Sequence, residues 1–172
     1  MSHEIPADLL AAFSRFVEDN LGLHFPEKRY ADLERGLRAA ADDLGICDPA
    51  SWARDLMQSC WSKEKIELLA AHLTVGETYF LRDAKAFEAL ETTVIPAILR
   101  APERRGRSLR VWSAACCTGE EPYSLALILS RMCPALVGTP VSILATDINP
   151  RFLQKAFAGI YGRWSFRCIP TI

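Results

Sequence analysis

The sequence predicts an α/β protein, in which a small all-α N-terminal domain precedes a segment that alternates strands with helices. In the N-terminal part, apolar residues recur at three- and four-residue spacing, which is typical of amphipathic helices. Farther along, two short runs at 109–113 and 141–146 are almost continuously apolar, as in buried parallel strands. We therefore expect a helical domain at 1–74, a connecting segment at 75–108 and a partial α/β domain at 109–172.

Four helices are expected in the N-terminal domain. The first covers about Pro6 to Asn20, and the second runs from Pro26, a residue suited to a first helical turn, to about Leu44. Two shorter helices should follow the Asp48-Pro49 pair and Ser62, because aspartate and serine are good N-cap residues.

The second of these helices has an apolar face and a basic face. Its expected core residues are Tyr30, Leu33, Leu37, Ala41 and Leu44. Lys28, Arg35 and Arg38 lie on the opposite side of the helical wheel. Such a basic face is either ordinary solvated surface or a contact for an acidic partner.

The connecting segment begins with a compact aromatic run at 78–82, and Asp83 can then cap a further helix. Pro96 lies within that helix and predicts a kink or an early break. Residues 101–108 have the composition of a loop.

The last part of the chain alternates strand, helix, strand and helix, at about 109–113, 119–132, 141–146 and 150–159. The two strands should be parallel, joined by a right-handed crossover and covered by helices on both faces. In such a sheet, a ligand binds at the carboxyl ends of the strands.

The loop after the first predicted strand lacks the G-x-G-x-x-G pattern of dinucleotide-binding proteins. Glu120 and Glu121 open the following helix, where they would repel phosphates but suit a ligand with an amine or a sulfonium. Cys116 and Cys117 lie in this loop and are expected to pack rather than to act as nucleophiles. Asp147, at the end of the second strand, can accept hydrogen bonds from ribose hydroxyls or serve as a turn or N-cap residue.

The composition is that of an ordinary globular protein, with 50% hydrophobic residues and a formal net charge of −1, which argues against general nucleic-acid binding. No stretch approaches the roughly 18 to 20 apolar residues of a membrane span, and the N-terminus lacks a signal-peptide pattern, so we expect a cytoplasmic protein. The six cysteines have no zinc-ligand spacing, and neither a metal site nor a disulfide is expected.

Four blocks of the sequence together resemble the chemotaxis receptor methyltransferases, the CheR family, which transfer a methyl group from S-adenosylmethionine to glutamate side chains of chemoreceptors. The blocks lie in the family's order at 75–82, 111–124, 145–149 and 158–161. The resemblance implies a signal-transduction enzyme in which a helical N-terminal domain precedes a Rossmann-like methyltransferase domain.

By this resemblance, five residues should bind S-adenosylmethionine, or S-adenosylhomocysteine as its product. Thr78 and Arg82 should border the methionine end, where Arg82 could pair with the ligand's carboxylate or with the acids of the first helical turn. Glu120 or Glu121 should lie near the amino group, and the sequence does not say which; Asp147 should hold the ribose. No catalytic residue is expected, because a glutamate nucleophile with a pKa of about 4.3 is already ionised at neutral pH.

The resemblance also implies that the basic face of the second helix contacts the methylation helices of chemoreceptors. Lys28, Arg35 and Arg38 are therefore the candidate receptor-binding residues.

The resemblance also implies a complete methyltransferase sheet of seven strands, whereas the sequence places only two before its last residue. We therefore expect a C-terminally truncated, inactive enzyme that binds S-adenosylmethionine weakly or not at all, with exposed sheet edges and the option of self-association. Two other classes stay open: a non-catalytic module that binds a receptor or regulator, and another nucleotide-dependent enzyme on the same scaffold.

Overall fold

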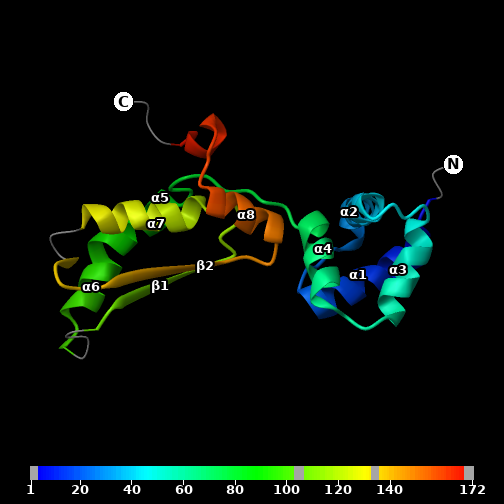
Figure 1. Ribbon diagram of the computed structural model, residues 1–172, viewed down its shortest axis with the longest axis horizontal. Coiled ribbons are helices and arrows are strands. Elements are labelled where there is room, and N and C mark those ends of the chain that lie inside the picture. The colour runs from blue at the N-terminus through cyan, green and yellow to red at the C-terminus, as the bar shows by residue number, and fades with distance from the viewer. Residues whose placement is uncertain (1–3, 103–106, 133–135, 169–172) are drawn as a thin grey trace. The chain divides into compact units, whose positions relative to one another are not determined.

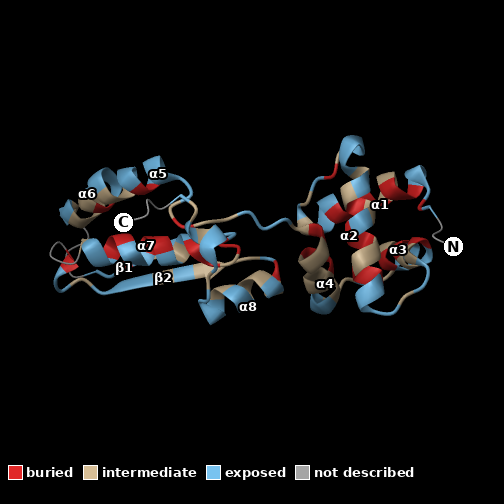
Figure 2. Ribbon diagram, turned by 90° about the horizontal axis from the view of Figure 1, so that it is seen from above, coloured by how far each residue is buried: buried red, intermediate tan, exposed pale blue. Residues whose placement is uncertain are grey.

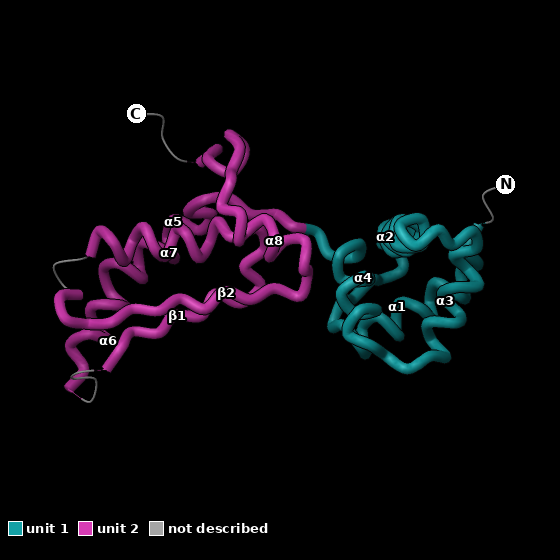
Figure 3. Tube along the Cα trace, in the orientation of Figure 1, with its two compact units in different colours: residues 1–75 teal, residues 76–172 magenta. Residues whose placement is uncertain are grey.

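The computed structural model describes residues 4–102, 107–132 and 136–168. The chain forms two compact units, Met1–Val75 and Gly76–Ile172, which are coloured separately in Figure 3. The three-part division at residues 74 and 108 stays a prediction. Among the described residues, no helix is both long and apolar enough to cross a membrane.

The first unit contains the four predicted helices (Figure 1). They are α1 (Ala7–Leu21), α2 (Tyr30–Asp43), α3 (Pro49–Gln58) and α4 (Lys63–Leu73), and a 3-10 turn, η1 (Glu27–Arg29), precedes α2. The expected N-caps are confirmed, since the Asp48 side chain accepts hydrogen bonds from the main chain of α3 and Ser62 does so for α4. Local sequence signals thus set the starts of α3 and α4.

The core of the first unit lies between the helices, and buried positions recur along α1 and α2 (Figure 2). Its fully buried side chains include Phe13, Val17, Leu33, Leu37 and Leu69. Leu44 was expected in this core but is 53% exposed. That expectation is wrong: Leu44 is the C-cap that follows the end of α2 at Asp43, and the last buried residue of the helix is Ala41.

Close contact between α2 and α4 depends on Gly36. A Cβ atom at this position would lie 2.7 Å from Leu73 Cδ2 and 2.8 Å from the carbonyl oxygen of His72. Only glycine lets the two helices approach this closely without a shift of main chain.

The second unit begins with a helical run interrupted by a π-helical turn. The run consists of α5 (Ala84–Ala89), the π turn η2 (Leu90–Val94) and α6 (Ile95–Arg100). Pro96 lies in the first turn of α6, so the predicted break occurs immediately before it. Part of the predicted loop at 101–108 lies outside the described residues.

Two parallel strands form the sheet, as predicted. Strand β1 (Leu109–Ala114) pairs in register with β2 (Val141–Thr146), from Leu109 opposite Val141 to Ala114 opposite Thr146. Helix α7 (Glu120–Arg131) connects the strands, and α8 (Pro150–Ala158) and a 3-10 turn, η5 (Arg163–Phe166), follow β2 (Figure 1). The carboxyl ends of both strands therefore meet at one edge of the sheet.

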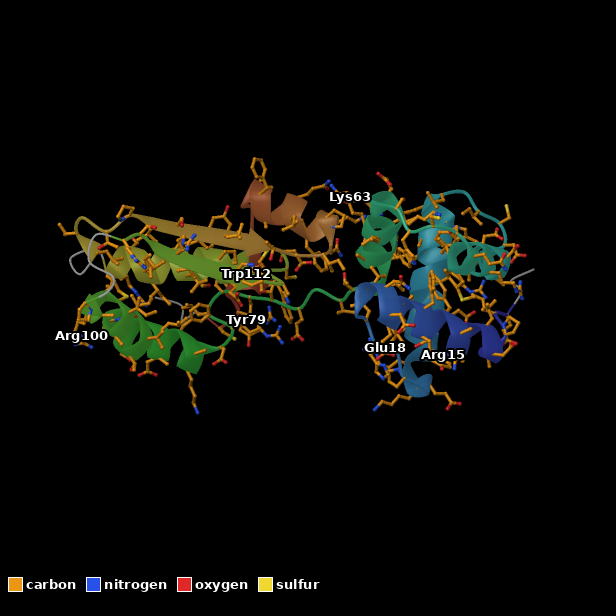
Figure 4. The ribbon with its side chains drawn as sticks, turned by 90° about the horizontal axis from the view of Figure 1, so that it is seen from below. Arg15, Glu18, Lys63, Tyr79, Arg100 and Trp112 are labelled. Atoms are coloured by element: carbon orange, nitrogen blue, oxygen red, sulfur yellow. The ribbon has the colours of Figure 1, made fainter. Side chains whose placement is uncertain are left out.

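Helices cover one face of this sheet. Leu109, Val111 and Ile143 pack against side chains of α6 and α7. On the other face, the register partners Trp112 and Leu144 are 68% and 60% exposed, and Figure 4 labels Trp112. The expectation of helices on both faces is therefore wrong for the described residues, which supply helices to one face alone.

Candidate functional site

The loop from β1 to α7 has an unusual main-chain conformation at the carboxyl ends of the strands. Three alternate residues have positive φ angles: Ala115 at 58°, Cys117 at 50° and Gly119 at 98°. The amide of Cys116 donates to the carbonyl oxygen of Thr146 over 2.9 Å, which ties the loop to the end of β2. At Gly119 a Cβ atom would lie 2.6 Å from the Tyr161 hydroxyl, so glycine is required there for both conformation and space.

Asp147 joins the two strand ends. Its Oδ2 accepts a 2.8 Å hydrogen bond from the amide of Cys117, and its Oδ1 accepts one of the same length from the amide of Asn149. Asn149, which is 1% exposed, is the N-cap of α8. Asp147 therefore makes a turn and holds the loop, and each of its oxygens keeps a further lone pair for a ligand.

Glu120 and Glu121, which the sequence could not distinguish, have different surroundings. Glu120 is 3% exposed and accepts hydrogen bonds from the Thr118 hydroxyl at 2.6 Å and the Ser165 hydroxyl at 2.8 Å, one on each oxygen. Glu121 is exposed, and only its Oε1 accepts a hydrogen bond, from Ser113 at 2.6 Å. Among the residues described, Oε2 of Glu121 has no partner.

Arg82 is paired within its own segment. It donates to the carbonyl oxygen of Glu77, and its Nη2 lies 3.6 Å from Glu77 Oε2. Within the described residues it makes no ion pair with Glu120 or Glu121, the partners offered as one alternative. Thr78 is half-buried beside it, and its carbonyl oxygen accepts a 3.5 Å hydrogen bond from Arg167.

Residues 161–167, of which the resemblance covers Tyr161 in the block 158–161 and for which no binding residue is predicted, lie against this site. The Tyr161 hydroxyl donates to the carbonyl oxygen of Thr118 over 2.8 Å. The amide of Phe80 donates to the carbonyl oxygen of Ser165 over 2.9 Å, and the Phe80 ring stacks on Phe166 with centroids 4.7 Å apart. Apart from the resemblance at Tyr161, the segment signals itself in the sequence only by its aromatic composition, because it has no helical or strand periodicity.

Burial alters three titratable groups beside the loop. Desolvation, followed by the negative charge of Glu120, raises the pKa of Tyr161 to about 12. Desolvation also raises the pKa values of Cys116 and Cys117, and the charge of Asp147 adds to the effect. Both thiols therefore stay protonated at neutral pH, which agrees with a packing role.

The face of α2 that was expected to be basic carries acids as well. Arg35 Nη2 lies 2.5 Å from Asp32 Oδ1, and Arg38 Nη2 lies 2.6 Å from Glu34 Oε1. Hydrogen bonds from Arg29 and then Arg35 lower the pKa of Asp32. This face is therefore mixed in charge, because Asp32 and Glu34 lie among its cations. Exposed Lys28 precedes it in η1.

Parallel strands, a strained loop and carboxylates at the strand ends define a Rossmann-type ligand-binding α/β unit. Residues 76–172, more than half of the chain, match the family described as CheR methyltransferase, SAM binding domain. The chain belongs to the CheR methyltransferase family, and the predicted family and fold class are confirmed.

Named relatives agree with this assignment. The chain is 39% identical over 110 residues to chemotaxis protein methyltransferase 2 of Vibrio cholerae, which covers 64% of this chain and 38% of that protein. A chemotaxis protein methyltransferase of Borreliella burgdorferi is 31% identical over 159 residues, 91% of this chain and 56% of its own length. A probable chemotaxis protein methyltransferase of Rhizobium etli is 42% identical over 132 residues, 77% of this chain and 47% of its own length. The chain thus spans about half the length of these curated relatives.

Proposed function

We propose that this chain takes part in the transfer of a methyl group from S-adenosylmethionine to glutamate side chains of chemoreceptors in the cytoplasm. The match of residues 76–172 to the S-adenosylmethionine-binding domain of the family carries this proposal. The chemotaxis methyltransferases among the relatives support the receptor as the substrate.

The residues at the strand ends fit such a cofactor. Asp147 is placed to accept hydrogen bonds from ribose hydroxyls with the lone pairs that the loop amides leave unused. Glu121, one of whose oxygens has no partner in the described part of the chain, suits the ligand's ammonium group better than the buried Glu120 does. Thr78 and Arg82 complete the proposed set at the methionine end. Glu120 then belongs to the support of the loop.

The proposed reaction makes modest demands on side chains. Bound S-adenosylmethionine supplies an activated methyl group on its sulfonium. The receptor glutamate, with a reference pKa of about 4.3, needs no base to become a nucleophile. The contribution of the protein is then to align the carboxylate with the methyl group and to exclude water.

The receptor contact is proposed for the outer face of α2. Lys28, Arg35 and Arg38 are cations on or beside it, and Asp32 and Glu34 hold the two arginines in the absence of a partner. The Arg35–Asp32 pair is exposed and exchanges readily, because such a pair contributes little free energy, whereas the side chains of the Arg38–Glu34 pair are only 26% and 25% exposed. An acidic receptor helix can therefore replace Asp32 most easily.

The test is a methylation assay with tritiated S-adenosylmethionine and the cytoplasmic part of a chemoreceptor. It is run on the 172-residue chain and on the product of the complete reading frame that contains it. Base-labile label on receptor glutamates is expected with the product of the complete reading frame. Asp147→Asn should weaken its S-adenosylhomocysteine binding at least about tenfold, because the variant loses a charge-assisted hydrogen bond and the acceptor for one main-chain amide. Failure of both proteins to bind S-adenosylhomocysteine would show the proposal to be wrong.

A further inference from the structure

Two arginines from distant parts of the second unit reach the same carboxylate. Arg82 Nη2 lies 3.6 Å from Glu77 Oε2, and Arg167 Nη2 lies 4.0 Å from Glu77 Oε1. Both guanidinium groups also donate to neighbouring main-chain carbonyls, Arg82 to that of Glu77 and Arg167 to that of Thr78. Glu77 therefore stands between two cations.

Arg167 is held in place before any ligand arrives. Its guanidinium carbon lies 3.9 Å from the ring centroid of Tyr79 and 4.2 Å from that of Trp164. It also donates to the carbonyl oxygen of Trp164 over 2.9 Å, and its side chain is only 20% exposed. Figure 4 shows Tyr79 on the segment that precedes α5. A guanidinium fixed against aromatic rings loses little freedom when it binds an anion.

Glu77, in contrast, is a weakly held partner. Its side chain is 68% exposed, and its oxygens lie 3.6 and 4.0 Å from the two guanidinium groups, beyond the usual hydrogen-bond distance. The two guanidinium groups carry two positive charges against the one negative charge of Glu77, so the three side chains together keep an excess of positive charge. Such a group can exchange its internal anion for a better placed carboxylate.

Resting on the proposed function, in which Arg82 already borders the carboxylate at the amino-acid end of the cofactor, we infer that Arg167 is a second arginine for that same carboxylate. Glu77 is the internal anion that this carboxylate displaces. Arg167 is then a second binding residue beside Arg82. Glu77 lowers the affinity for the ligand, because its contacts with both arginines must be broken first.

Calorimetric titration with two ligands tests this inference. S-adenosylhomocysteine carries the amino-acid end, whereas methylthioadenosine lacks it. Glu77→Gln removes the competing charge and is expected to tighten S-adenosylhomocysteine binding about two- to fivefold. Arg167→Lys keeps the charge but loses the planar fork, and is expected to weaken that binding about tenfold. The affinity for methylthioadenosine should stay unchanged in both variants.

The matched control is Glu91→Gln. Glu91 forms a 2.9 Å ion pair with Arg131, at the other end of α7 from the loop, and this substitution removes the same charge. It should alter the affinity for neither ligand. Melting curves of all variants show whether each is folded, and the exposed Glu77→Gln variant keeps the test decisive if Arg167→Lys is unstable.

The outcomes separate this inference from the proposed function. Suppose that both ligands bind, but that the Glu77 and Arg167 variants change the affinities for the two ligands equally or change neither affinity. The two arginines then do not bind the carboxylate, and the inference is wrong. If the unaltered proteins bind neither ligand, the proposed function is wrong, and so is the inference that rests on it. Selective changes for S-adenosylhomocysteine support both.

Discussion

The hydroxyl of Ser165 donates a 2.8 Å hydrogen bond to Glu120 Oε1, and so joins the start of α7 to a turn 45 residues later in the chain. With the 2.6 Å bond from Thr118, this gives each oxygen of the nearly buried Glu120 carboxylate a partner. A buried carboxylate stabilises a fold only while its oxygens are satisfied. The bond therefore makes residues 161–167 part of the site's support.

Ser165→Ala should destabilise the second unit. One oxygen of Glu120 would lose its donor while the charge stays buried, and the free energy of unfolding should fall by about 1–3 kcal/mol. Urea unfolding followed by circular dichroism measures this. Ser130→Ala, an exposed serine on α7, should change it by less than about 0.5 kcal/mol. Equal stability of the two variants would contradict the role given to Glu120.

Gly36→Ala tests the close approach of α2 and α4. Helix propensity alone would make this change favourable by about 1 kcal/mol. The contacts with Leu73 and the His72 carbonyl should outweigh that gain, so the net result should be a destabilisation of about 1–3 kcal/mol. Gly162→Ala, where a Cβ atom meets nothing within 4 Å, is the control and should be close to neutral. A more stable Gly36→Ala protein would show that the helices can separate without cost.

Tyr161 should make stability depend on alkaline pH. Its pKa in the fold is about 12, whereas that of an unfolded tyrosine is about 10. The fold holds this proton more tightly than the unfolded chain does. Its stabilising contribution is therefore fully present below a pH of about 10 and is lost as the pH rises through 12.

An ultraviolet titration of tyrosine ionisation measures this effect. The unaltered protein should show a late component near pH 12, and Tyr161→Phe should lack it. The variant should also lose less stability over the same pH range. If the signal lost in Tyr161→Phe lies near pH 10, the ordinary pKa of a tyrosine, the hydroxyl is in solvent rather than against the Thr118 carbonyl.

The proposed receptor surface is tested by reversing charge on α2. Arg35→Glu with Arg38→Glu should raise the KM for the receptor about tenfold or more, since like charges then face an acidic helix, and cofactor affinity should not change. Arg15→Glu with Arg54→Glu is the control, because it alters net charge equally at exposed positions of α1 and α3; Figure 4 labels Arg15. Equal methylation kinetics in all three proteins would exclude this surface.

Most of the secondary structure could be predicted because its signals are local. Asp48 and Ser62 start helices through hydrogen bonds to main chain two or three residues away. The apolar runs of β1 and β2 indicated parallel strands, and the structure confirms the pairing. The core position predicted for Leu44 is wrong, because this residue is the C-cap of α2 and lies beyond the last buried residue of the helix, Ala41.

The sequence by itself determined the helical unit, the parallel strand–loop–helix arrangement and the family resemblance. Only the tertiary structure decided that Glu120 is buried while Glu121 is exposed, and that Arg82 and Arg167 share Glu77. The physical reason is the range of the interactions. Caps and periodicity act within one or two turns, whereas the contacts of Ser165 with Glu120 and of Arg167 with Thr78 join residues 45 and 89 positions apart.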